Sequence, residues 1–279
     1  MMKKDLSKKV TLSLLVGSML FANSYALAAN GGEKESGNSI VITRDNVGEY
    51  AGAAEINAGK GSTVDSNSVE INGNSADDRL NLNANLVSGG YADSDFGAAL
   101  NNTVTINNVK FIDVGSETFD IYGGLTDAGA VTGNNVSITN VEIANMNSTF
   151  IAAGANGIDG GDGSTSVGEV SNNTLTINGT LVGANLHLYG GYVDNANGNA
   201  INNKVIIGKA NDDKTTITDR IQNDNEEDIN AVYGGYSEGS GNASGNRVDI
   251  TNADVKINRI TGGYSLKGNA DSNIVSINN

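Results

Sequence analysis

The sequence predicts an all-β fold, a parallel β-helix of about seven repeat units, and three observations support it. A strand phrase, Asn-x-Val-x-Ile, occurs seven times between residues 67 and 277, with Leu175 in place of Val in one copy. A second phrase alternates with it, and consists of an apolar residue, one further residue, the pair Gly-Gly and usually a Tyr after the pair. No stretch after residue 29 shows a sustained helical apolar period. Self-similarity at a period of about 20 to 50 residues is typical of stacked repeat architectures.

The strand phrase has the pattern of a half-buried strand. Val104 and Ile106 alternate with Thr103 and Thr105, and every other copy alternates in the same way. Successive copies are 27 to 43 residues apart, so loops of varying length join strands of constant length. The first residues of the seven copies are Asn67, Asn102, Asn134, Asn173, Asn203, Asn246 and Asn273.

These seven asparagines are expected to form a ladder at one corner of the solenoid. Successive coils of a parallel β-helix stack about 4.8 Å apart, so each position lies over its equivalent in the next coil. A side-chain amide can then hydrogen-bond to its copies above and below, and Asn tolerates turn conformations.

The paired glycines of the second phrase are expected at another corner, where positive φ or close backbone approach is needed. Tyr122, Tyr189 and Tyr233 are expected to stack there from coil to coil. The phrase occupies residues 87–91, 121–124, 188–192, 232–236 and 260–264, with a degraded copy at 151–154. Residues 40–57 contain no clean copy of either phrase and are predicted to form an N-terminal cap.

Two other β architectures fit less well. A β-propeller needs about four strands in each repeat, whereas this sequence shows two strand signals. An up-and-down membrane barrel needs aromatic girdles at both strand ends, and these are missing.

The first 29 residues predict a secretory signal peptide. Lys3, Lys4, Lys8 and Lys9 precede an apolar run at 10–22 and a small-residue Ala-Leu-Ala site at 26–28. The run is shorter than the roughly 20 residues of a membrane span. The expected organisation is a signal peptide at 1–29, a polar leader at 30–39 and a solenoid at 40–279, truncated at its C-terminus because it stops inside a repeat. The chain is therefore expected to be exported.

Composition excludes some partners. The chain has no Cys, Pro or Trp, and the part after residue 29 carries 13 basic and 31 acidic residues. Such a surface repels nucleic acid and anionic lipid. Stability must then come from backbone pairing and small apolar contacts.

Together, the signal peptide, the absence of cysteine, the richness in Asn, Gly and Thr, and the Tyr-Gly-Gly-Tyr and Gly-Asn-x-Val-x-Ile repeats resemble the passenger regions of bacterial autotransporters, especially adhesin-like repeat proteins. The resemblance covers about residues 40–279. It implies a right-handed parallel β-helix at the cell surface or released from it. Autotransporters end in an outer-membrane barrel, and this chain departs from that pattern.

Little in the sequence indicates chemistry, so no enzyme activity, cofactor, or catalytic or metal-binding residue is predicted. His187, the single histidine, is expected to point outward from a strand without metal partners. A polysaccharide lyase or glycosidase is one alternative, and it needs clustered carboxylates. The candidates are Asp77-Asp78, Asp212-Asp213 and Glu226-Glu227-Asp228.

A calcium-stabilised secreted repeat protein is the second alternative. Residues 157–163, Gly-Ile-Asp-Gly-Gly-Asp-Gly, resemble one turn of a calcium β-roll. Because that motif completes its oxygen cage only in tandem, a single copy favours a Gly-rich loop.

The sequence therefore predicts a secreted or cell-surface structural or adhesin-like module without catalytic activity. A surface glycan or host-surface ligand is the expected partner, bound along one face and through the inserts at 145–170 and 211–230. The C-terminal edge is expected to stack on a missing region or another copy, and membrane attachment would require the missing barrel.

Overall fold

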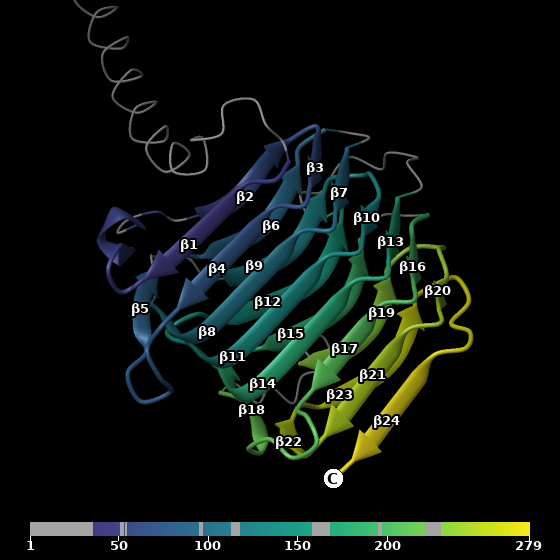
Figure 1. Ribbon diagram of the computed structural model, residues 1–279. Coiled ribbons are helices and arrows are strands. Elements are labelled where there is room, and N and C mark those ends of the chain that lie inside the picture. Colours follow the sequence, from purple (N-terminus) through teal and green to yellow (C-terminus); the bar gives the residue numbers. More distant parts are fainter. Residues whose placement is uncertain are drawn as a thin grey trace, which may run out of the picture.

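The computed structural model describes residues 36–50, 53, 55–94, 97–112, 118–157, 168–194, 197–220 and 230–279. Figure 1 shows a parallel β-helix whose coils advance from β1 to β24. Three sheets run along it, and neighbouring strands within each are parallel. The predicted fold class is confirmed, while the right-handed sense stays a prediction. The predicted signal peptide lies outside the described residues.

The strand phrase forms the largest sheet. Equivalent residues pair in register, as Val104 does with Val69 and Val136. Val104 and Ile106 are fully buried, whereas Thr103 and Thr105 are half-buried on the outer face, as predicted. The strands are β1 (Ser39–Thr43), β4 (Ser68–Asn72), β8 (Thr103–Ile112), β11 (Asn135–Ile143), β14 (Thr174–Gly183), β17 (Lys204–Ile207), β21 (Arg247–Thr251) and β24 (Ile274–Asn278), with β5 (Leu80–Asn83), β18 (Thr215–Asp219) and β22 (Ala253–Lys256) beside them.

The Gly-Gly phrase forms a seven-stranded sheet. Its degraded copy is a regular member, because Ile151 pairs with Ile121 and Leu188, and Gly154 pairs with Gly124. The strands are β2 (Glu55–Gly61), β6 (Leu86–Ala92), β9 (Thr118–Thr126), β12 (Ser148–Asn156), β15 (Leu186–Val193), β19 (Ala231–Ser237) and β23 (Arg259–Ser265).

A third sheet was missing from the sequence prediction, which counted two strands per repeat. Its strands span two or three residues, too few for an alternation to be recognised. They are β3 (Thr63–Asp65), β7 (Ala98–Leu100), β10 (Val131–Thr132), β13 (Glu169–Ser171), β16 (Asn199–Ile201) and β20 (Ala243–Ser244). One small apolar side chain from each packs inside, for example Val64, Ala99 or Val131.

The asparagine ladder is confirmed. Asn134 Oδ1 accepts hydrogen bonds from the backbone N–H and the Nδ2 of Asn102, at 2.8 and 2.9 Å. Asn134 Nδ2 in turn donates to Asn173 Oδ1 and to the Ala99 carbonyl. The same pattern links all seven predicted members, and Asn38 extends the ladder by one coil.

The ladder asparagines themselves do not adopt the left-handed backbone conformation. The residue before each of them does, with φ between 53° and 74°. These eight residues are Gly37, Ser66, Asn101, Gly133, Asn172, Asn202, Gly245 and Ser272. The turn that aims each amide inward is therefore made one position earlier than the sequence suggested.

The N-terminal region is a coil of the solenoid, so the expected cap at 40–57 was wrong. Ile40 and Ile42 of β1 pair with Val69 and Ile71, which makes residues 38–42 an eighth copy of the strand phrase. In β2, Ile56 pairs with Val87. The short 3₁₀ helix η2 (Val47–Tyr50) between them buries Tyr50 against the core. No helix within the described ranges has the length and apolarity that a membrane span requires.

The paired glycines lie inside strands rather than at a corner, and their φ values are not positive, so that expectation was wrong. Close approach is their actual role. A Cβ on Gly124 would lie 2.6 Å from the Asn134 side chain, and one on Gly123 would lie 2.4 Å from the Ala153 carbonyl oxygen. Glycine is required here because the ladder passes directly behind the strand.

Candidate functional site

The outer surface of the seven-stranded sheet carries two rows of mostly aromatic side chains, one before and one after the Gly-Gly pair. We call this surface the tyrosine face. Its aromatic members are Tyr91, Tyr122, Phe150, Tyr189, Tyr192, Tyr233, Tyr236 and Tyr264. The residues before the glycines form the inner row and those after them form the outer row.

Strand β15 shows why these rings point outward. Leu186 and Leu188 enter the core, so Tyr189 between the second leucine and the glycines lies outside. A Cβ on Gly191 would enter the ladder at Asn203, so Tyr192 points outward again. The strand geometry therefore explains both features: glycine is needed where the strand faces the ladder, and the flanking tyrosines point to the outer face.

The rings stack from coil to coil. In the outer row, the Tyr192 and Tyr236 ring centroids are 5.4 Å apart with planes 9° apart, and those of Tyr236 and Tyr264 are 5.3 Å apart with planes 16° apart. In the inner row, Tyr189 and Tyr233 lie 5.4 Å apart at 8°. The predicted stacking of Tyr189 on Tyr233 is confirmed.

Tyr122 is separated from that stack because the next coil has Ala152 at its position. The Phe150 ring fills the gap, 5.7 Å from the ring of Tyr122 and 4.8 Å from that of Tyr189. The predicted tyrosine column is therefore interrupted at Ala152, and the ring of Phe150, two positions earlier on β12, connects its two parts.

A row of carboxylates borders the outer row, two residues further along each strand. Tyr91 donates a hydrogen bond to Asp127 Oδ1 at 3.1 Å, and Tyr192 donates one to Glu238 Oε2 at 3.3 Å. In both cases the acceptor belongs to the next coil. The members are Asp93, Asp127, Asp194 and Glu238. The sequence reading missed them, although the signal was present as the continuation Gly-Gly-Tyr-x-Asp/Glu.

The Asp194 carboxyl keeps its proton up to near neutral pH. Burial, together with the hydrogen bond and the negative charge of Glu238, raises the pKa of Asp194 to about 7. Burial is also the main cause of the raised pKa values of Tyr192 and Tyr236, the latter to about 12. The phenol groups of Tyr192 and Tyr236 are therefore uncharged in neutral solution.

Two cations contact the face from its ends. Lys60 Nζ lies 4.8 Å from the centroid of the Tyr91 ring, and Arg259 Nη1 donates to the Tyr233 hydroxyl at 3.2 Å. His187 is half-buried, and its ring lies parallel to that of Tyr189 at 6.5 Å. Its predicted outward position is confirmed. Over the described part of the chain, no three His, Cys, Asp or Glu side chains are grouped to hold a metal ion.

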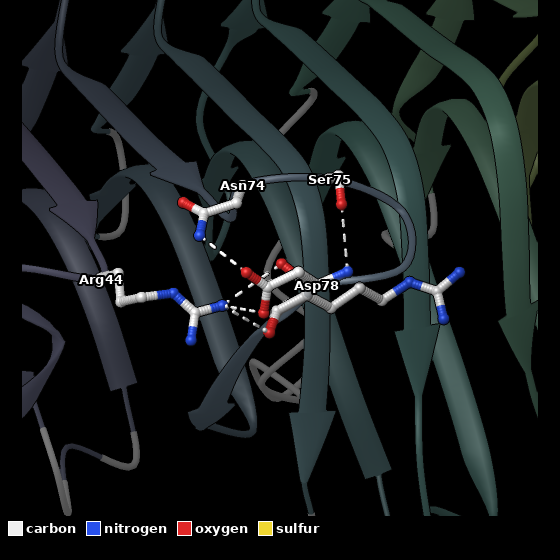
Figure 2. A network of polar contacts seen from close by, with 5 residues as sticks. Arg44, Asn74, Ser75 and Asp78 are labelled. Carbon is white, nitrogen blue, oxygen red and sulfur yellow. Dashed lines mark hydrogen bonds and ion pairs between the residues drawn. The ribbon is translucent and has the colours of Figure 1, made fainter.

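The first predicted carboxylate pair, Asp77-Asp78, lies in the loop between β4 and β5, and Figure 2 shows the polar network around Asp78. Its carboxylate accepts hydrogen bonds from Arg44 Nη2 at 2.6 Å and from Asn74 Nδ2 at 2.8 Å. Its backbone N–H donates to Ser75 Oγ at 3.1 Å. Asp78 therefore fixes the loop and ties it to the preceding coil.

The second predicted carboxylate pair, Asp212-Asp213, lies elsewhere on the surface. Asp212 lies in an exposed turn between β17 and β18, 3.6 Å from Lys209 Nζ, and Asp213 beside it is exposed. The triplet at 226–228 and residues 158–163 of the Gly-Asp loop lie outside the described residues. The structure thus brings together carboxylates that sequence reasoning did not select.

The carboxyl pair of Asp194 and Glu238 does not have glycosidase geometry. Glycosidases hold two carboxyl groups about 5 to 9.5 Å apart, with sugar or water between them. Asp194 and Glu238 are hydrogen-bonded to each other instead. Comparison of the chain with protein families, curated proteins and solved structures found no match.

Proposed function

We propose that this chain is a non-catalytic, exported surface module of the adhesin type, whose tyrosine face binds a surface glycan. The observation that carries the proposal is the outer row, where Tyr192, Tyr236 and Tyr264 are half-buried and held on consecutive strands. Partly exposed aromatic clusters on a polar surface mark interaction sites.

Tyrosine suits such a role chemically. It supplies a large contact area with few rotatable bonds, so little entropy is lost on binding. Its hydroxyl and the neighbouring carboxylates can exchange hydrogen bonds with sugar hydroxyls. Because the rings stack in parallel along the solenoid, they offer a regular array to a polymeric ligand.

Both predicted inserts border the seven-stranded sheet. The insert at 145–170 contains strand β12, and Gly157 follows this strand at the level of the carboxylate row. The insert at 211–230 contains strand β18, and its last residue, Asn230, lies directly before β19. Gly157 and Asn230 therefore lie at opposite ends of the strands of this sheet. Loops on a rigid scaffold are frequent carriers of recognition.

Export and surface location belong to the same proposal. They rest on the signal-peptide pattern at residues 1–29 and on the resemblance to autotransporter passengers. The acidic composition argues against nucleic acid as the partner.

Binding to immobilised neutral, acidic and amino-sugar oligosaccharides tests the proposal. The double variant Tyr192→Ala/Tyr236→Ala should lower affinity about tenfold or more. The matched control Thr105→Ala/Thr176→Ala changes the outer face of the eleven-stranded sheet and should bind like the parent chain. Binding to no oligosaccharide, or equal loss in both variants, would contradict a glycan-binding tyrosine face.

A further inference from the structure

Three tyrosines of the outer row occupy one column on consecutive coils. Tyr236 pairs in register with Tyr192 on β15 and with Tyr264 on β23. Their rings are nearly parallel, with centroids 5.4 and 5.3 Å apart. Backbone pairing on both sides fixes this arrangement, so each phenol faces another at close range.

We propose that this column is an oxidative modification site, at which Tyr236 forms dityrosine cross-links with Tyr192 or Tyr264. The cross-link would join neighbouring coils covalently in a chain that has no cysteine for disulfides. The proposal does not depend on glycan binding, because it concerns the rings themselves.

The chemistry requires an external one-electron oxidant, and a haem peroxidase with hydrogen peroxide provides it. Each phenol loses one electron and one proton to give a phenoxyl radical. Two radicals join through the carbons ortho to oxygen, and the ortho hydrogens then move so that both rings become phenols again. One peroxide accepts the two electrons and two protons and becomes two waters, so atoms and electrons balance.

The site also provides a proton acceptor. Tyr192 already donates its hydroxyl hydrogen bond to the Glu238 carboxylate at 3.3 Å. Burial raises the pKa of Tyr192 and Tyr236, so phenolate is scarce at neutral pH and the proton must leave together with the electron. The Glu238 carboxylate can receive the proton that Tyr192 releases.

Access differs between the rows. The outer tyrosines are half-buried and reach the surface, where a peroxidase can take an electron from them, whereas Tyr189 and Tyr233 of the inner row are each 5% exposed. Tyr91 has the outer-row position on an earlier coil, but its neighbours in the column are Lys60 and Leu125. Tyr91 is therefore an internal control that has the same position in its strand and a carboxylate partner on the next coil, but no tyrosine on the adjacent coil.

The experiment treats the dilute full chain with a haem peroxidase and hydrogen peroxide and maps linked peptides by mass spectrometry after trypsin. Residues Tyr192, Tyr236 and Tyr264 lie on different tryptic peptides, 111–204, 221–247 and 260–267. We expect peptide 221–247 linked to each of the other two within single chains, in a yield independent of protein concentration. Peptide 80–110, which contains Tyr91, should stay unlinked.

Three variants sharpen the test while keeping the fold. Tyr236→Phe retains the stacked ring and should abolish the link to peptide 260–267, whereas Tyr91→Phe should change nothing. Glu238→Gln retains a hydrogen-bond acceptor but not the base, and it should reduce the 192–236 link several-fold while sparing the 236–264 link. Circular dichroism checks that each variant is folded.

Three results would overturn the proposal. They are links confined to chain dimers, equal linking of peptide 80–110, and a link to peptide 260–267 that survives in Tyr236→Phe.

Discussion

The asparagine ladder and the tyrosine face run side by side through the solenoid, one behind the Gly-Gly strands and the other in front of them. The ladder has the same residue in all eight coils, and its six central members are at most 1% exposed. The outer row changes from coil to coil, reading Lys60, Tyr91, Leu125, Ala155, Tyr192, Tyr236 and Tyr264. The difference shows which positions the fold constrains and which it leaves available for function.

The physical reason is the cost of an unsatisfied buried polar group. Each central ladder amide uses all its hydrogen-bonding capacity on the backbone and on two identical neighbours, so any other residue leaves buried donors without acceptors. Lys60 and the four outer-row tyrosines are partly solvated, so a change there leaves no buried donor or acceptor unsatisfied and costs mainly contact area. Variation is therefore tolerated on the tyrosine face and excluded from the ladder.

The largest expected effect is the loss of one ladder residue. Asn134→Ala removes the acceptor of Asn102 and two donated hydrogen bonds in a fully buried place. We expect the free energy of unfolding to fall by about 3 to 5 kcal/mol, measured by urea denaturation. Exposed Asn135→Ala is the matched control, with an expected change below about 0.5 kcal/mol. Equal effects would mean that the ladder does not stabilise the stack.

The second prediction concerns the boundary between the two features. Gly124→Ala places a methyl group 2.6 Å from Asn134 side-chain atoms, and the strand must shift to admit it. We expect a loss of about 1 to 3 kcal/mol in the same denaturation assay. Gly48→Ala, with nothing within 4 Å of the added Cβ, should be neutral. A stable Gly124→Ala would show that the ladder can move.

On the tyrosine face, Tyr236→Ala removes two stacking contacts from a partly exposed position. We expect a loss of about 1 kcal/mol, smaller than that of either ladder change. Tyr236→Phe should keep most of the stability, because it retains the ring. If Tyr236→Ala were as damaging as Asn134→Ala, the distinction between scaffold and surface would fail.

The smallest effect is expected at the carboxyl pair and depends on pH. The pKa of Asp194 rises from 3.8 to about 7 on folding, so the folded chain holds a proton that the unfolded chain releases between these values. Its contribution to stability is therefore lost as pH rises from about 4 to about 7. Asp194→Asn should match the parent at pH 4 and exceed it at pH 8, by no more than about 1 kcal/mol because the carboxyl is half-exposed. Equal urea midpoint differences at both pH values would contradict this.

Elements with a long repeated residue pattern were predicted from the sequence, and elements with a short one were missed. The five-residue strand phrase was recognised seven times, but the copy at residues 38–42, which has Ile40 at the Val position, was missed. The third sheet gave no signal, since strands such as β10 have two residues. At the candidate site, the stack of Tyr189 on Tyr233 was predicted. The contact of the Phe150 ring with Tyr189 was not, because it depends on the small side chain of Ala152, which pairs with Tyr189 and leaves room for that ring.

The sequence by itself determined the repeat, the period-two burial and the ladder, because these depend on residues that recur at equivalent positions and need only stacking to meet. The tertiary structure alone decided which side chains from different coils share a surface. Asp194 and Glu238 are 44 residues apart in the chain. They meet because Val193 and Ser237, the residues before them, pair in register on neighbouring strands, whatever the length of the chain between. Register is set by backbone hydrogen bonds and core packing, so contacts on the outer face follow from the fold and cannot be obtained from spacing along the chain.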